Sequence, residues 1–233
     1  MQVVQPRGFE MVTVHDAQPA GADPTAGRRR VTVVAKVLFA LLGFSALVTE
    51  VATLVARNRF VPGDFFSYFT VESNALAVAS LLVSGFALAQ GRSSHGLDLF
   101  RGAVTFCMTT TLLIFIVLLS GYPASTLTAV PWDNTVLHYL MPIAVIADWL
   151  FASRVGAIPL RRALLWLLLP LLYLVYSLIR GPIVDWYPYP FMDPSVRGYS
   201  GVAITSVVLA VVLALVAVAV AFVARWTPVG TRR

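Results

Sequence analysis

Six long apolar runs constrain this chain more than any other feature of its sequence. They lie at about residues 31–56, 66–89, 102–121, 135–152, 163–180 and 201–224. A helix of about 20 apolar residues, rising 1.5 Å per residue, is long enough to cross the hydrocarbon of a bilayer. The sequence therefore predicts an all-α membrane protein with a six-helix transmembrane domain over residues 31–224.

The overall charge agrees with a membrane protein and argues against nucleic acid as a partner. Only 12% of the residues are charged, about half the share that is usual in soluble domains. The net charge of +6 arises because arginines flank the apolar runs, so the expected partner is membrane lipid. Lys36 is the only lysine among 17 cationic residues. This bias is typical of GC-rich bacterial genomes and predicts a location in the bacterial plasma (inner) membrane.

The positions of the cationic residues orient the helices. If the N-terminus is cytoplasmic, thirteen cationic residues fall in cytoplasmic segments, and the four outer ones are Arg57, Arg59, Arg180 and Arg197. Because cytoplasmic loops carry the excess of Lys and Arg, both termini are predicted to lie inside. Residues 1–30 are polar and lack periodicity, so they are expected to form a disordered cytoplasmic tail. Residues 225–233 form a second, short basic tail.

The last outer loop is rich in aromatic residues and proline, with the sequence Tyr187-Pro188-Tyr189-Pro190-Phe191. Aromatic residues at a membrane interface usually anchor the protein there. The prolines also stiffen the loop, because each fixes its backbone φ angle. Two interpretations therefore remain open: the loop is part of an anchoring belt, or it roofs a cavity that faces outward.

A few polar residues inside the apolar runs are candidates for function, because polar groups in a membrane are costly and need partners. Both the second and the fourth predicted helix enter from the outer face. At 1.5 Å per residue, Thr70 then lies about 6 Å and His138 about 5 Å from that face. Glu50 lies in the same outer layer, where it is expected either to orient His138 or to pair with Arg57 or Arg180.

The surroundings of these two residues carry further signals. Thr70, Ser73 and Asn74 are spaced i, i+3, i+4 and share one helix face, which must point inward because lipid cannot satisfy an amide. Pro142 has no N–H and removes the helical bond to the carbonyl four residues earlier, that of His138. We therefore expect a kink and a free carbonyl beside His138.

Neither a metal site nor a cofactor is predicted. Cys107 is the only cysteine, and the three histidines are His15, His95 and His138. Only His138 lies in an apolar run, and no His, Cys and carboxylate cluster has the spacing of metal ligands.

Three motifs in order resemble a known family. They are Tyr68-Phe69-Thr70-x-x-Ser73-Asn74, Leu137-His138 followed by Pro142 and Asp148-Trp149, and the loop Tyr187–Phe191. Over residues 31–224 the chain resembles the bacterial six-helix "Pr-six-Pr" membrane proteins. That family is similar to the animal androgen-induced and androgen-dependent TFPI-regulating proteins, which are membrane threonine hydrolases that cleave fatty-acid esters of hydroxy fatty acids.

The resemblance implies an intramembrane hydrolase of lipid-like acyl esters, with Thr70 as nucleophile and His138 as general base. Asn74, with Ser73, is then the candidate for contacts to the oxyanion or the substrate. Glu50, Asp133 and Tyr176 are the candidates for orienting His138. Two other hypotheses stay open: a non-enzymatic protein that binds or transports a small molecule at the same polar layer, and a purely structural membrane subunit.

Overall fold

The computed structural model describes residues 24–123, 128–152 and 155–226, and within these ranges the chain is helical and contains no strand. Six helices in the described part of the chain are long and apolar enough to cross a membrane. The predicted architecture, a six-helix multi-pass membrane protein, is therefore confirmed at the level of the fold.

In the described part of the chain the six spans and their connections are built from nine α-helical pieces and four π-helical or 3₁₀ turns. The first two spans are α1 (Pro24–Ala56) and α3 (Phe69–Ala89), with the short α2 (Pro62–Phe65) between them. The third is α4 (His95–Ile114) with the π-helical turn η1 (Phe115–Leu119). The fourth joins α6 (Pro131–Thr135), the π-helical turn η2 (Val136–Leu140) and α7 (Met141–Phe151). The fifth joins α8 (Leu160–Leu164), the 3₁₀ turn η3 (Leu165–Leu167) and α9 (Leu168–Val184), and the sixth is α10 (Pro194–Val223), preceded by the 3₁₀ turn η4 (Pro190–Met192).

Three predicted helix starts need correction, and one of them is that of α4, which begins at His95 rather than at residue 102. Helix α1 begins at Pro24, so residues 24–30 are helical and do not belong to a disordered tail; the rest of that tail, and residues 227–233, lie outside the described residues. Arg29 favours the early start, because its side chain donates to the carbonyls of Leu88, at 2.8 Å, and Ala89 in the last turn of α3. Helix α10 begins at Pro194 rather than at residue 201, and is interrupted at Gly198, where φ is 68°.

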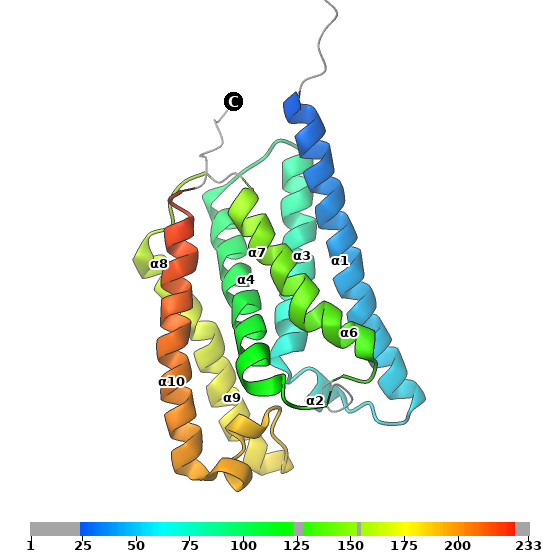
Figure 1. Cartoon of the computed structure of the whole chain (residues 1–233), viewed down its shortest axis with the longest axis vertical. Coiled ribbons are helices and arrows are strands. Elements are labelled where there is room, and N and C mark those ends of the chain that lie inside the picture. Colours follow the sequence, from blue (N-terminus) through cyan, green and yellow to red (C-terminus); the bar gives the residue numbers. More distant parts are fainter. Residues whose placement is uncertain (1–23, 124–127, 153–154, 227–233) are drawn as a thin grey trace, which may run out of the picture.

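The helices pack as a bundle in which neighbours in space are not always neighbours in sequence. Helix α1 packs on α3, α3 on α4, and α4 on both α7 and α10 (Figure 1). At the contact of α1 with α7, a Cβ atom on Gly43 would lie 2.5 Å from Cε of Met141. A side chain at this position would require the end of Met141 to move, and Ala46, one turn further on, is fully buried. Small residues thus allow close helix packing here.

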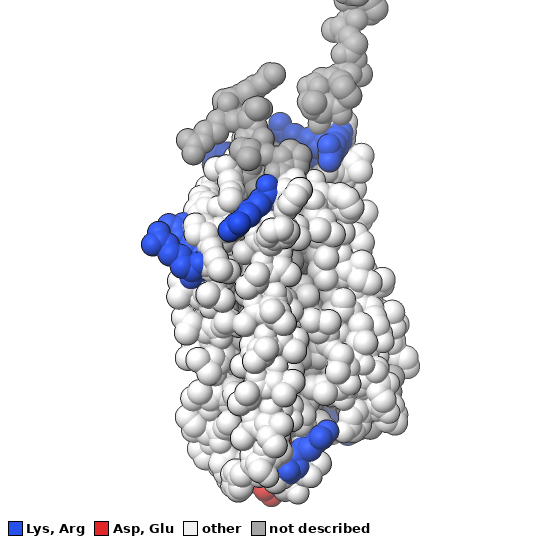
Figure 2. Space-filling view, turned by 60° about the vertical axis from the view of Figure 1, so that its left-hand side comes forward, with Lys and Arg blue, Asp and Glu red and all other residues white. Residues whose placement is uncertain are grey.

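The surface agrees with a bundle that lies in lipid. On the face in Figure 2, Lys and Arg gather mainly near the end at which α1 begins, and a wide uncharged zone separates them from the other end. Large apolar side chains such as Val117, Leu172 and Ile204 are exposed, each with more than 60% of its surface accessible. Water would oppose such exposure, whereas hydrocarbon favours it.

A buried ion network ties four spans together at the end that carries most of the basic residues. Asp148 of α7 pairs with Nζ of Lys36 at 2.5 Å and with Nη2 of Arg101 at 3.0 Å. Arg101 also pairs with Asp98 at 3.3 Å, and Lys36 donates to Oγ of Ser84 on α3 at 2.8 Å. Two cations and two carboxylates balance, which is the condition for burying charge at tolerable cost. This network holds α1, α3, α4 and α7 in register.

Candidate functional site

Thr70 is the second residue of α3 and is buried. Tyr68 is extended and ends the preceding segment, and its carbonyl accepts bonds from the amides of Val71 and Glu72. The amide of Thr70 belongs to the first helical turn, where backbone N–H groups have no partner within the helix. It donates instead to the phenol oxygen of Tyr189, at 3.3 Å.

His138 lies in the π-helical turn η2, and its ring has a defined tautomer. The Nδ1 atom is 3.1 Å from the backbone oxygen of Asn134, one turn earlier. Because a carbonyl oxygen only accepts hydrogen bonds, Nδ1 must carry the proton, which leaves Nε2 of the neutral ring as an acceptor. The ring also stacks on Phe115, with centroids 4.2 Å apart. Both contacts hold the ring in one orientation.

The structure brings Thr70 and His138 together. Their Oγ1 and Nε2 atoms are 3.3 Å apart, although 68 residues separate them in the chain. Since Nε2 is the acceptor, the threonine hydroxyl donates to it. A hydroxyl that donates to a neutral histidine, whose second nitrogen is held by a third group, is the arrangement that activates a nucleophile. Here the third group is a backbone carbonyl.

Asn74 occupies a structural position one turn below Thr70. Its Nδ2 group donates to the carbonyl of Thr70 at 2.9 Å and to that of Leu137 at 3.1 Å. Leu137 needs this donor because a carbonyl in η2 accepts from the amide five residues later. The Val136 carbonyl, for example, accepts from the amide of Met141. By the same offset Leu137 would require an N–H from Pro142, which has none. The sequence predicted that the His138 carbonyl would lose its helical donor. In the structure Asn74 bonds the carbonyl of Leu137 instead, one residue earlier.

Tyr189 was not among the predicted site residues. Its hydroxyl lies 3.3 Å from Oγ1 of Thr70 and 3.3 Å from the Thr70 amide nitrogen. Burial raises the pKa of Tyr189 to about 12, so the phenol is protonated at neutral pH. The signal in the sequence was the stiff Pro188-Tyr189-Pro190 segment, but nothing in it marks Tyr189 rather than Tyr187 as the residue that reaches Thr70.

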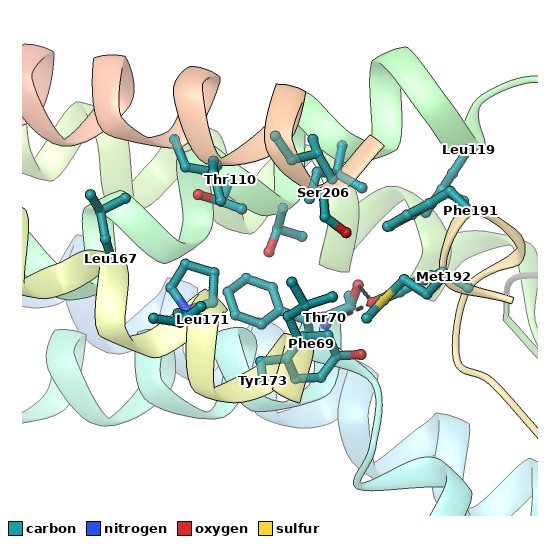
Figure 3. Close-up of a pocket in the computed structure, with 18 residues that line it drawn as sticks. Phe69, Thr70, Thr110, Leu119, Leu167, Leu171, Tyr173, Phe191, Met192 and Ser206 are labelled. Carbon is teal, nitrogen blue, oxygen red and sulfur yellow. Dashed lines mark hydrogen bonds between the residues drawn. The ribbon is translucent and has the colours of Figure 1, made fainter. Parts of the chain in front are cut away.

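An apolar cavity of about 210 Å³ opens beside Thr70, between α3, α4, α9 and α10. Figure 3 shows Leu167 at one end of it, with Phe191 and Leu119 at the other, and Thr70 lies near Met192. From Leu167 in η3 to Leu174 in α9 the lining spans about 10 Å, at roughly 1.5 Å per residue. Its volume exceeds the roughly 150 Å³ of a dry protein cavity that binds benzene. Tyr189, Phe191 and Met192 are part of its wall, so the loop between α9 and α10 contributes to a cavity.

The other predicted residues have different partners. Oγ of Ser73 lies 3.2 Å from the Thr70 carbonyl and 2.9 Å from Oγ1 of Thr111. Both carboxylate oxygens of Glu50 accept the amide of Ala129, at 2.8 and 2.9 Å. Asp133 is fully buried next to Glu50, and the Tyr176 hydroxyl is 2.7 Å from Oγ of Ser67. In the described part of the chain, the hydrogen bond that orients His138 comes from Asn134, not from these three candidates.

Among the described residues, no three His, Cys, Asp or Glu side chains gather as a metal site would require. Comparison of the chain with protein-family models, with curated proteins and with solved structures finds no match. The argument for function therefore depends on the geometry around Thr70.

The Asn74 bridge can be tested by removing the amide at nearly constant volume. Asn74→Leu leaves the buried Leu137 carbonyl without a donor, and we expect the free energy of unfolding in mixed micelles to fall by about 1–3 kcal/mol. Gln90→Leu removes an exposed amide at the far end of α3 and serves as control, with little change expected. Equal stability of both variants would contradict the bridge.

Proposed function

We propose that this protein is a membrane hydrolase that cleaves lipid-like acyl esters, with Thr70 as nucleophile and His138 as general base. The observation that supports it most is the 3.3 Å approach of Thr70 Oγ1 to the unprotonated Nε2 of His138. The adjoining apolar cavity suits an acyl chain. Membrane lipid and a lipid-like ester are then the partners, and the reaction needs no cofactor.

The proposed reaction follows from the tautomer of His138. Thr70 Oγ1 transfers its proton to Nε2 as it attacks the ester carbonyl, and the proton then passes to the departing alcohol. Water, deprotonated by the same nitrogen, hydrolyses the acyl-threonine and restores the hydroxyl. Covalent catalysis of this kind divides one difficult displacement into two easier ones.

The resemblance to the bacterial "Pr-six-Pr" proteins, and through them to the animal threonine hydrolases, gives the same roles to Thr70 and His138. We propose membership of that group on the strength of the three motifs. The site geometry agrees with the resemblance independently of it, because the distance and the tautomer follow from the fold.

We also propose that the protein lies in a bacterial inner membrane with both termini cytoplasmic. The start of α1 and the end of α10 lie at the same end of the bundle (Figure 1), as six spans require. The same end of the bundle carries several arginines. Arg28 and Arg29 lie near the start of α1, and Arg161 and Arg162 lie near the start of α8. By the positive-inside rule that end is cytoplasmic, so Thr70 opens toward the outer face.

Reporter fusions in a bacterial host test this orientation. We expect alkaline phosphatase to be active when fused after Asp185, in the loop that follows α9, and inactive after Arg92. Green fluorescent protein fused to the complete C-terminus should fluoresce, because it folds in the cytoplasm. The opposite pattern at all three positions would invert the proposed topology.

Substitutions of Thr70 and His138 test the chemistry. We expect Thr70→Val to abolish hydrolysis of long-chain esters and labelling by a fluorophosphonate probe, and Thr70→Ser to retain part of both. His138→Gln should reduce kcat by about 100- to 10,000-fold, because the base is lost. Purified protein in detergent is assayed for ester turnover and for mass-spectrometric labelling.

The matched control is Thr109→Val on α4, because its hydroxyl bonds the Thr105 carbonyl, at 2.8 Å, and Thr109 does not line the cavity. Undiminished labelling of Thr70→Val would overturn the nucleophile assignment. A protein that binds fatty acids in the cavity but turns over no ester, in wild type or variant, would instead support the alternative, a non-enzymatic lipid-binding or transport protein.

The cavity predicts a preference for acyl length. Leu167→Trp fills its far end, so we expect kcat/KM for palmitoyl esters to fall by about 10-fold or more while that for butanoyl esters changes little, since a few buried methylenes are worth this much. Leu168→Trp is the matched control, because Leu168 is exposed and does not line the cavity. A parallel loss for both chain lengths would place the acyl chain elsewhere.

A further inference from the structure

The proposed hydrolysis requires a group that stabilises the negative charge on the carbonyl oxygen. Asn74 was the candidate from the sequence, but both hydrogens of its amide already bond carbonyls. Reversing the amide would turn its oxygen toward those two carbonyls, which cannot donate, so the orientation is determined. The Ser73 hydroxyl is likewise engaged, with Thr111 and the Thr70 carbonyl.

Tyr189 offers a hydroxyl directly beside the attacking oxygen. Its hydroxyl is 3.3 Å from Oγ1 of Thr70, so a carbonyl attacked by that oxygen has its own oxygen within reach of the phenol. The phenol oxygen in turn accepts the Thr70 amide at 3.3 Å. This amide is at the N-terminal end of a 21-residue helix, where the helix dipole favours negative charge. The hydrogen bond from the amide polarises the phenol O–H and strengthens it as a donor.

The loop holds the phenol in place. Tyr189 is the residue before the turn η4, its ring stacks on Phe191 with centroids 5.2 Å apart, and Tyr68 packs edge-on against it at 5.8 Å. Pro188 and Pro190 on either side limit the backbone. A donor that is fixed before the reaction costs no reorganisation when charge develops.

We propose that the Tyr189 hydroxyl is the oxyanion donor of the ester hydrolysis, held and polarised by the backbone amide of Thr70. This inference rests on the proposed function. It makes the last outer loop part of the catalytic machinery and leaves Asn74 as a positioning residue.

The steps balance as follows. The bond from Thr70 Oγ1 to the acyl carbon forms as the hydroxyl proton moves to Nε2 of His138, and the carbonyl π pair moves to the carbonyl oxygen. Tyr189 donates a hydrogen bond to that oxygen and keeps its proton, consistent with the raised pKa. The π bond then re-forms, the bond to the leaving oxygen breaks, and the proton on Nε2 passes to the alcohol. Water repeats the sequence on the acyl-threonine.

Tyr189→Phe tests the inference, because it removes the hydroxyl and keeps the ring. We expect kcat for long-chain esters to fall by about 100- to 1,000-fold, the usual effect of losing one oxyanion donor, with KM nearly unchanged. Tyr176→Phe is the matched control: Tyr176 does not line the cavity and its hydroxyl lies 2.7 Å from Oγ of Ser67, so kcat should be nearly retained.

A second measurement separates charge stabilisation from a merely structural role. A long-chain trifluoromethyl ketone forms a tetrahedral adduct with the nucleophile, whereas the corresponding methyl ketone only occupies the cavity. Tyr189→Phe should weaken inhibition by the first about 100-fold and leave the second unchanged. Equal loss for both ketones, or a retained kcat, would overturn the inference while leaving Thr70 and His138 in their roles. Wild-type protein that neither cleaves esters nor reacts with fluorophosphonate would overturn the proposed function itself.

Discussion

A carbonyl without a hydrogen-bond donor is the constraint on which the site depends. Pro142 cannot bond the Leu137 carbonyl, and in the interior of a membrane protein no bulk water is present to do so. Asn74 supplies the donor and bonds the Thr70 carbonyl with the same nitrogen. One amide thereby joins the N-terminal turn of α3 to the π-helical turn η2. The distance between Thr70 and His138 is set by this bridge.

The bundle is stabilised differently at its two ends and along its sides. Buried ion pairs centred on Asp148 hold four spans together at the end that carries most of the basic residues, and the amide bridge acts near the other end. Helix α9, in contrast, buries only Ser177 and Gly181 fully. Because α9 packs less closely than the other helices, space remains between it and its neighbours. This explains why the cavity lies along α9 and α10. The loop between α9 and α10 closes that space with Tyr189 and Phe191.

Much of this arrangement could be predicted from the sequence, because length, hydropathy and arginine placement are local properties. They were sufficient for six spans and for placing Thr70 and His138 at one depth. Tyr189 could not be predicted, since it reaches Thr70 across 119 residues and its role depends on how a loop folds back. The role of the Asn134 carbonyl could not be predicted either. Every residue has a carbonyl, and it is the π-helical turn that directs this one at the His138 ring. The candidates for orienting His138 were side chains, and the structure uses the backbone.

The use of a backbone carbonyl to orient His138 has a chemical consequence for the proposed hydrolase. A neutral carbonyl fixes the tautomer of His138 as well as a carboxylate does, but it stabilises the protonated ring less. In serine proteases, replacing the carboxylate by an amide costs about 10,000-fold in kcat, a loss attributed largely to the wrong tautomer. Here a neutral carbonyl bonds Nδ1 and retains the correct tautomer, whereas a carboxylate in that place would be costly to desolvate inside a membrane. His138 is therefore a weaker base than a histidine paired with a carboxylate, but the site is less costly to bury. More of the stabilisation of the transition state must then come from hydrogen-bond donors near the oxyanion. A phenol backed by a helix N-terminus is suited to that demand.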